Sequence, residues 1–146
     1  MSTENQPQSA DDLSRLYREV ILQHASQPVG FQKAIEETCS NEQFNPLCGD
    51  RVIIQFQVND EVIQDAAFSG ESCAICKASA SLLCALIPGR SVENFRTVRN
   101  WLEHSLLSGE ETDGPEALKA LLGVRKFPSR IRCATLPWIA GSEALS

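Results

Sequence analysis

An alternation of apolar and mostly polar residues between residues 51 and 68 constrains the fold more than any other feature of the chain. A period of two is typical of β-strands, whose side chains point to opposite faces in turn. Asn59 and Asp60 interrupt the run as turn residues, and the second stretch stops at Ser69 and Gly70. The pattern predicts an antiparallel hairpin. Its apolar positions are Val52, Ile54, Phe56 and Val58, then Val62, Ala66 and Phe68.

The predicted hairpin brings chemically reactive residues to one end of the sheet. Its turn places residue 51 opposite residue 68, so the start of the first strand lies beside the end of the second. Cys48 and Asp50 come directly before the first strand, and Cys73 follows the second. We therefore expect these three side chains to lie close together.

Five helices are predicted around the hairpin, from apolar residues at three- and four-residue spacing and from capping residues or prolines. The helix after the hairpin should run from Cys73 to Ile87. Ser72 as its N-cap would put Cys73 in the first turn, where backbone N–H groups favour a thiolate. Pro137 should kink or stop the last helix because it has no N–H. The other expected boundaries are Asp11 or Asp12 to Pro28, Ser91 to Gly109, Pro115 to Leu122, and Pro128 for the start of the last helix, with an edge strand at residues 34–39.

The six cysteines are expected to be ligands, reactive thiols or small core residues, as in a reducing compartment, and not disulfides. Cys84 would lie roughly 16 Å along the helix from Cys73, too far to share a metal ion, and is expected in the core. Cys39 is expected to be structural. Cys76 forms a C-x-x-C pair with Cys73. The pair could be a redox dithiol or half of a zinc site, or Cys76 could be a spare thiol near the site. A four-cysteine zinc ribbon is excluded because the chain has no second C-x-x-C pair.

Cys133 lies in a basic stretch of the chain, 60 residues after Cys73. Arg130 and Arg132 bring positive charge near Cys133, which would favour its thiolate. The alternative is a solvated face for the arginines and a core position for the thiol. Nothing in the spacing connects Cys133 with Cys48.

Composition limits the classes of function. The 146 residues suit one domain, expected at residues 13–146 after a disordered tail at 1–12. The formal net charge of -6 argues against a nucleic-acid partner. No apolar stretch approaches the ~18 residues of a membrane span, and no signal peptide is visible. The expected location is therefore the cytoplasm.

Three motifs occur in order along the chain. They are Asn45-Pro46-x-Cys48-Gly49-Asp50-Arg51, then Phe68-x-Gly70-x-x-Cys73-x-Ile75-x-x-Ala78-Ser79-Ala80-Ser81, then Phe127-Pro128-x-Arg130-x-x-Cys133-Ala134-x-Leu136-x-Trp138. Together they resemble the SufU-type branch of the IscU/NifU N-terminal family of iron–sulfur cluster assembly proteins. The likeness runs from about Leu13 to Trp138. The separation of about 60 residues between Cys73 and Cys133 fits the SufU branch, whose insertion would lie at about residues 90–114.

The resemblance implies an α+β fold, in which helices pack on a small antiparallel sheet as an α/β sandwich with the site at one end. It maps the family's metal ligands onto Cys48, Asp50, Cys73 and Cys133, with Arg132 where IscU proper has a histidine. Such a set suits tetrahedral zinc. The implied partner is a cysteine desulfurase, one of whose histidines takes a zinc position and frees Cys48 to accept persulfide sulfur. Downstream cluster-assembly or carrier proteins would then receive it.

Other functions remain open on the same residues. The chain could be a scaffold for a [2Fe–2S] cluster, or a zinc-stabilised interaction module without chemistry. As a sulfur acceptor it would be the partner of a cysteine desulfurase, and neither as an acceptor nor as a scaffold would it be a stand-alone enzyme. A redox dithiol of Cys73 and Cys76 is a further alternative. Arg130, Arg132 and Cys76 are the auxiliary residues of the predicted site. The chain departs from the family's usual pattern at Ser72, Cys76 and Pro137, and a thiol at 76 could change the metal preference or hold a second persulfide.

Overall fold

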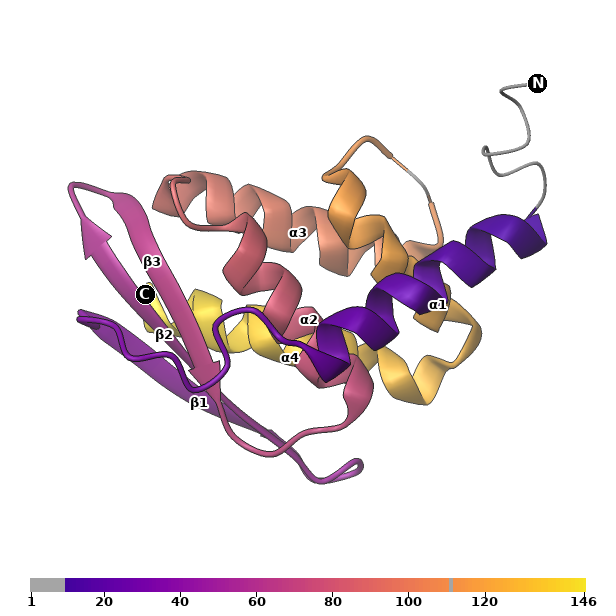
Figure 1. Cartoon of the computed structure of the whole chain (residues 1–146). Coiled ribbons are helices and arrows are strands. Elements are labelled where there is room, and N and C mark those ends of the chain that lie inside the picture. Colours follow the sequence, from indigo (N-terminus) through magenta and orange to yellow (C-terminus); the bar gives the residue numbers. More distant parts are fainter. Residues whose placement is uncertain (1–9, 111) are drawn as a thin grey trace, which may run out of the picture.

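Three antiparallel strands in the order β1-β2-β3 form one layer, and the helices cover one face of it (Figure 1). The computed structural model describes residues 10–110 and 112–146. The expected α+β fold is confirmed. Its elements are α1 (Ala10–Ser26), β1 (Cys39–Asn45), β2 (Asp50–Asn59), β3 (Val62–Ser69), α2 (Ala74–Leu86), α3 (Val92–Ser108), the 3₁₀ helix η2 (Glu116–Lys126) and α4 (Pro128–Ala144).

Helix α4 connects the two layers, because it packs against β1, β2, α2 and α3. The indole Nε1 of Trp138 donates to the Ser79 hydroxyl at 3.1 Å, and that hydroxyl donates to the Ala134 carbonyl at 2.5 Å. Phe95 of α3 stacks on Trp138 with ring centroids 5.5 Å apart. The ring contact fixes α3 against α4, and the hydrogen bonds of Ser79 fix α2 against α4. The site needs that rigidity, since each of the two helices supplies part of it.

The β2–β3 hairpin forms as predicted, but its register was predicted wrongly. Ile54 faces Phe68, three residues further along than the expected pairing of residue 51 with residue 68. The turn lies at Asp60 and Glu61, which have φ angles of 52° and 63°. Positive φ at both central residues gives the twist that matches right-handed strands, so the chain turns one residue later than the Asn–Asp pair suggested. An irregularity between Gln57 and Val58 adds to the shift.

The first strand also lies elsewhere than predicted. The edge strand expected at residues 34–39 is found at Cys39–Asn45, where it pairs with β2 from Cys39↔Phe56 to Asn45↔Asp50. The stretch is mostly polar, so its propensity gave no strand signal. It is extended because it pairs with β2 along one edge and contacts α4. The consequence for the site is that β1 and β2 form a second hairpin, whose loop carries Cys48.

Several helix boundaries differ from the expected ones. Helix α1 begins at Ala10, so neither Asp11 nor Asp12 precedes it as a cap, and residues 1–9 of the expected tail lie outside the described residues. The helix expected to end at Leu122 continues as η2 to Lys126. None of the helices in the described ranges is both long and apolar enough to cross a bilayer.

Helix α4 does not stop at Pro137 but continues to Ala144. Pro137 leaves the Cys133 carbonyl without its usual N–H donor four residues on. The loss is offset by packing, because Trp138, Ala140 and Gly141 are all buried beyond the proline. The expected starts at Pro128 and Ser91 are confirmed: Pro128 lies at the beginning of α4, and the Ser91 hydroxyl caps α3 by accepting from the Asn94 N–H at 2.9 Å.

Candidate metal centre

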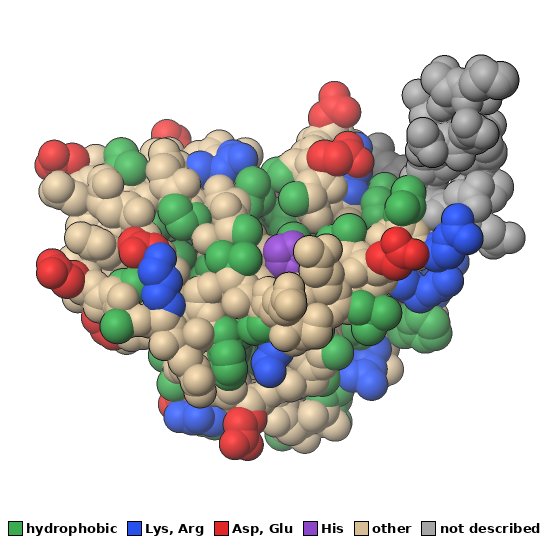
Figure 2. All heavy atoms as spheres, viewed as in Figure 1, with side chains coloured by type: hydrophobic (Ala, Val, Ile, Leu, Met, Phe, Trp, Pro, Cys, Tyr) green, Lys and Arg blue, Asp and Glu red, His purple; other side chains and the backbone are tan. Residues whose placement is uncertain are grey.

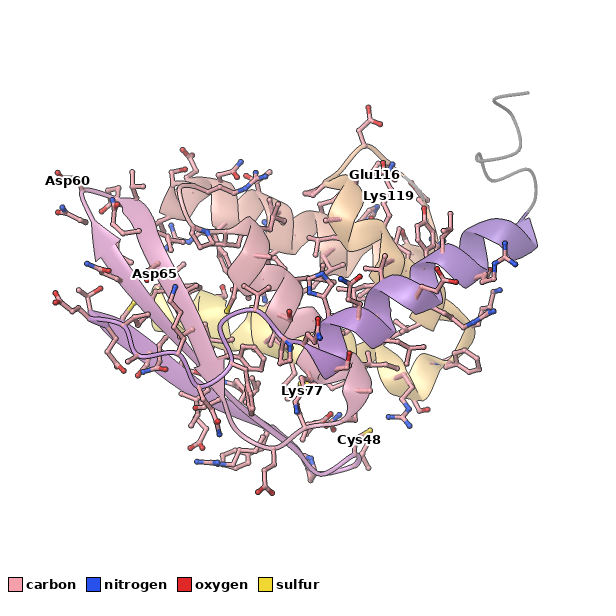
Figure 3. The ribbon with its side chains drawn as sticks, in the orientation of Figure 1. Cys48, Asp60, Asp65, Lys77, Glu116 and Lys119 are labelled. Atoms are coloured by element: carbon pink, nitrogen blue, oxygen red, sulfur yellow. The ribbon has the colours of Figure 1, made fainter. Side chains whose placement is uncertain are left out.

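The loop between β1 and β2 presents Cys48 at one end of the sheet (Figure 3). Asn45 and Asp50 pair across the end of the two strands, and the Cys48 N–H donates to the Asn45 carbonyl at 3.2 Å. Gly49 has a φ of 71°, a left-handed conformation that glycine adopts without strain. Cys48 is half-buried, whereas its neighbour Leu47 is 91% exposed. An incoming group can therefore approach Cys48 from the loop side.

Asp50 links this loop to the start of α2. Its Oδ1 accepts a hydrogen bond from the Cys73 N–H at 2.7 Å, and its Oδ2 lies 3.8 Å from the Cys73 Sγ. Cys73 itself is the N-cap of α2, where Ser72 was predicted, and its Sγ accepts from the Cys76 N–H at 3.5 Å. The predicted helix N-terminus thus supplies N–H groups to both the thiol and the carboxylate of the site.

Cys133 joins the group from α4, near its start. Its Sγ lies 3.3 Å from the Cys48 Sγ, a separation far longer than a disulfide bond. The ligand atoms of Cys48, Asp50 and Cys133 all lie within 4.8 Å of one another. Cys73 lies outside that group of three and adjoins it through Asp50. The structure therefore brings three of the four expected metal ligands within 4.8 Å of one another, and the fourth, Cys73, contacts Asp50 at a comparable distance.

The donor set fits a tetrahedral zinc ion in its chemistry, and two of its separations are near the spacing that zinc requires, whereas Cys73 lies farther from the rest of the group. Zinc–sulfur bonds of ~2.3 Å and zinc–oxygen bonds of ~2.0 Å place neighbouring ligand atoms about 3.5–3.8 Å apart. The observed separations of 3.3 Å for Cys48–Cys133 and 3.8 Å for Cys73–Asp50 are close to this range. Asp50 is only 2% exposed, and the described part of the chain gives it no lysine or arginine partner. A buried carboxylate among thiols needs a cation to offset its desolvation.

Burial controls the ionisation of the thiols around the centre. Burial raises the pKa of Cys133, and hydrogen bonds with Cys48, Asp50 and Cys73 raise it further. Without a cation this thiol therefore keeps its proton, and metal binding must displace that proton. The pKa of Arg130 is raised by its hydrogen bond with Cys133 and by the other two thiols of the site, so this guanidinium faces the centre.

The remaining cysteines play different parts. Cys76 is fully buried, and burial followed by the charge of Asp50 raises the pKa of its thiol well above the ordinary value. It is not in the donor group of three and packs in the core. Cys84 is buried as expected, and burial raises its pKa to about 12. Cys39 is half-buried at the far end of β1.

Asn45 is a site residue to which sequence analysis gave no role. It is 4% exposed, and its Nδ2 donates toward the Cys133 Sγ at 3.9 Å. The available signal was the place of Asn45 at the start of the first motif, three residues before Cys48, whereas the strand that contains it was predicted at residues 34–39. Because Asn45 closes β1 opposite Asp50, it holds the second hairpin against the start of α4.

Alanine in place of Asn45 should weaken zinc binding about tenfold, because groups that orient metal ligands typically contribute a factor of 10–100 in affinity. Competition with a chromophoric zinc chelator measures this effect. Asn41→Ala, roughly 13 Å away on the same strand, is the matched control and should leave the affinity unchanged. Equal affinities for wild type and Asn45→Ala would show that Asn45 does not position Cys133.

Comparison with known proteins places this geometry in a family. The NifU-like N terminal domain model matches residues 16–133. The chain is 36% identical over 132 residues to the zinc-dependent sulfurtransferase SufU of Bacillus subtilis, covering 88% of both chains. It is 33% identical over 138 residues to the iron–sulfur cluster assembly scaffold protein IscU of Streptococcus pyogenes, covering 91% of this chain and 84% of that protein.

Solved structures agree with the fold. A NifU-like N-terminal protein from Brucella abortus superposes with a TM-score of 0.80 at 22% identity, covering 91% of this chain and 94% of the other. The putative SUF-system scaffold protein of Fervidobacterium islandicum gives a TM-score of 0.77 at 26% identity, covering 88% and 95%. With the family model matching most of the chain and close relatives covering nearly all of it, the protein belongs to the NifU-like N-terminal domain family of iron–sulfur cluster assembly proteins.

Proposed function

We propose that this protein accepts sulfur from a cysteine desulfurase at Cys48 and passes it on for iron–sulfur cluster assembly, with zinc bound by Cys48, Asp50, Cys73 and Cys133. The observation that carries the proposal is the position of Cys48, a half-buried thiol on an accessible loop within a compact donor group. The similarity to a zinc-dependent sulfurtransferase over 88% of both chains supports the same role.

The chemistry is thiol–persulfide exchange. The Cys48 thiolate attacks the outer sulfur of a persulfide on the donor protein, a new sulfur–sulfur bond forms on Cys48, and the donor cysteine leaves as a thiolate. Zinc, when bound, supplies the positive charge that keeps the coordinating cysteines deprotonated. Asp50 fixes the start of α2 through its hydrogen bond with the Cys73 N–H, and Arg130 faces the thiols with its positive charge.

The proposed chemistry requires a reducing compartment, for which we propose the cytoplasm. Cys48 and Cys133 lie 3.3 Å apart, so an oxidising compartment would favour a bond between them. Reduced thiols are needed both for sulfur transfer and for metal binding. A downstream acceptor of the sulfur completes the proposed pathway.

A second candidate function is a scaffold on which a [2Fe–2S] cluster is assembled, because iron–sulfur clusters are also held by cysteine thiolates and IscU relatives carry that description. Metal and acid-labile sulfide analysis of protein purified without added iron separates the two. We expect about one zinc ion per chain and no sulfide. A coloured protein with iron and sulfide in equal amounts would favour the scaffold. A protein that contains neither zinc nor iron would contradict both candidate functions.

A further inference from the structure

The surface around the thiols differs in charge from the rest of the molecule. The chain as a whole carries a formal net charge of -6. Lys126, Arg130 and Arg132 are nevertheless all exposed on the segment that leads into Cys133. None of the three has a carboxylate partner within the described residues. Positive charge is therefore concentrated beside the site of an acidic protein.

Carboxylates near the site do little to cancel this charge. Asp50 is buried within the donor group, and Glu42 is ion-paired with Arg51. Glu71, two residues before Cys73, is exposed and offsets part of this positive charge. Figure 2 shows basic and acidic side chains near one another along the lower edge of the molecule, where Figure 3 places Cys48.

Two large apolar side chains flank the paired thiols and remain exposed. Leu47, 91% exposed, directly precedes Cys48, and Phe127, 60% exposed, lies roughly 9 Å along the chain axis before Cys133. Aromatic and aliphatic anchors bordered by arginine are typical of protein–protein interfaces. Leu47 and Phe127 are therefore candidates for the apolar anchors of a contact surface around the thiols.

We propose that Leu47, Phe127, Lys126, Arg130 and Arg132 form a docking surface, here called the thiol rim, for an acidic face of the protein that delivers the persulfide. The proposal rests on the proposed function, because a donor whose sulfur reaches Cys48 must cover Leu47. Opposite charges across the interface speed the encounter and fix its orientation.

A second copy of this chain is a poorer occupant of the thiol rim. A symmetric dimer formed through this surface would bring the three basic side chains and their copies into one interface. Like charges in one interface oppose association. The acidic donor protein is therefore the occupant to which the charge pattern points.

Charge reversal on the thiol rim tests the proposal. Lys126→Glu and Arg132→Glu, singly and together, are titrated against the persulfide-forming cysteine desulfurase of the same organism at equal metal content. We expect the double variant to raise the dissociation constant about tenfold or more at low ionic strength. The difference from wild type should shrink at high salt, where surface charges are screened. Leu47→Ser should weaken binding with an unchanged salt dependence.

Arg96→Glu is the matched control. Arg96 is exposed, and its guanidinium contacts the Leu145 carbonyl, roughly 20 Å along α4 from Arg132. Arg96→Glu changes the net charge as much as each single rim variant does, but it should leave binding of the desulfurase unchanged. If the charge-reversed rim binds as tightly as wild type at low salt, or if Arg96→Glu weakens binding equally, the thiol rim is not the docking surface. If wild type itself neither binds the desulfurase nor accepts its sulfur, the proposed function fails first.

Discussion

Serine in place of Cys48 should abolish sulfur transfer to the protein, with the yield of protein-bound persulfide falling at least about 100-fold. The serine hydroxyl is not deprotonated near neutral pH, so it cannot attack a persulfide sulfur as a thiolate does. Cys133 lies 3.3 Å away but is fully buried, so it cannot take over the role. Single-turnover mixing with persulfide-loaded desulfurase, followed by intact-protein mass spectrometry, measures the mass gain of one sulfur atom.

Cys39→Ser is the matched control for this experiment. Cys39 is also half-buried but starts β1, roughly 20 Å along the strand from Asn45. Its substitution should leave sulfur transfer at the wild-type level. Sulfur acceptance by Cys48→Ser at the wild-type rate would move the acceptor role to another thiol. Sulfur found on Cys76 in that variant would support the second persulfide that its position suggested from the sequence.

Asparagine in place of Asp50 should lower zinc affinity about 100-fold or more, because the substitution removes the negative charge of a proposed ligand from a buried donor group. The asparagine oxygen can still accept the Cys73 N–H, so the start of α2 keeps its hydrogen bond. With zinc in excess, a 100-fold loss of affinity lowers the free energy of unfolding by about 2.7 kcal/mol. Thermal unfolding with and without zinc measures the loss, which should vanish when a chelator removes the metal from both proteins.

Asp60→Asn is the control for the Asp50 experiment. Asp60 is exposed in the β2–β3 turn, roughly 30 Å along β2 from Asp50, and asparagine tolerates its φ of 52°. Figure 3 shows Asp60 and Cys48 at opposite ends of the sheet. Zinc stabilisation should be the same as in wild type. If Asp50→Asn also binds zinc as wild type does, Asp50 is not a metal ligand and serves only to cap α2.

The hairpin illustrates how far local patterns determine the fold. The alternation around Ile54 and Phe56 predicted both strands and their meeting at one end of the sheet. The register came out three residues off, because the turn type depends on the φ angles of Asp60 and Glu61, which composition does not reveal. The error did not separate Cys48 from Cys73, since both flank the same end of the hairpin.

Strand β1 and the course of α4 depended on tertiary contacts. The mostly polar stretch from Cys39 to Asn45 has no strand pattern of its own, and it is extended through its pairing with β2. Pro137 was expected to kink or end α4 by its local effect, and the helix does not end there but continues to Ala144, where Trp138 beyond the proline packs against Phe95. In both places long-range packing outweighed local propensity.

The sequence by itself determined the α+β class, the hairpin, and the likeness that named four candidate ligands. Only the tertiary structure put Cys133 beside Cys48 and turned the Asn45 amide toward that thiol. The reason is that strand and helix periodicity follow from neighbours a few residues apart, whereas α4 reaches the β1–β2 loop only after the whole chain has packed. Spacing along the chain carries no information about that approach.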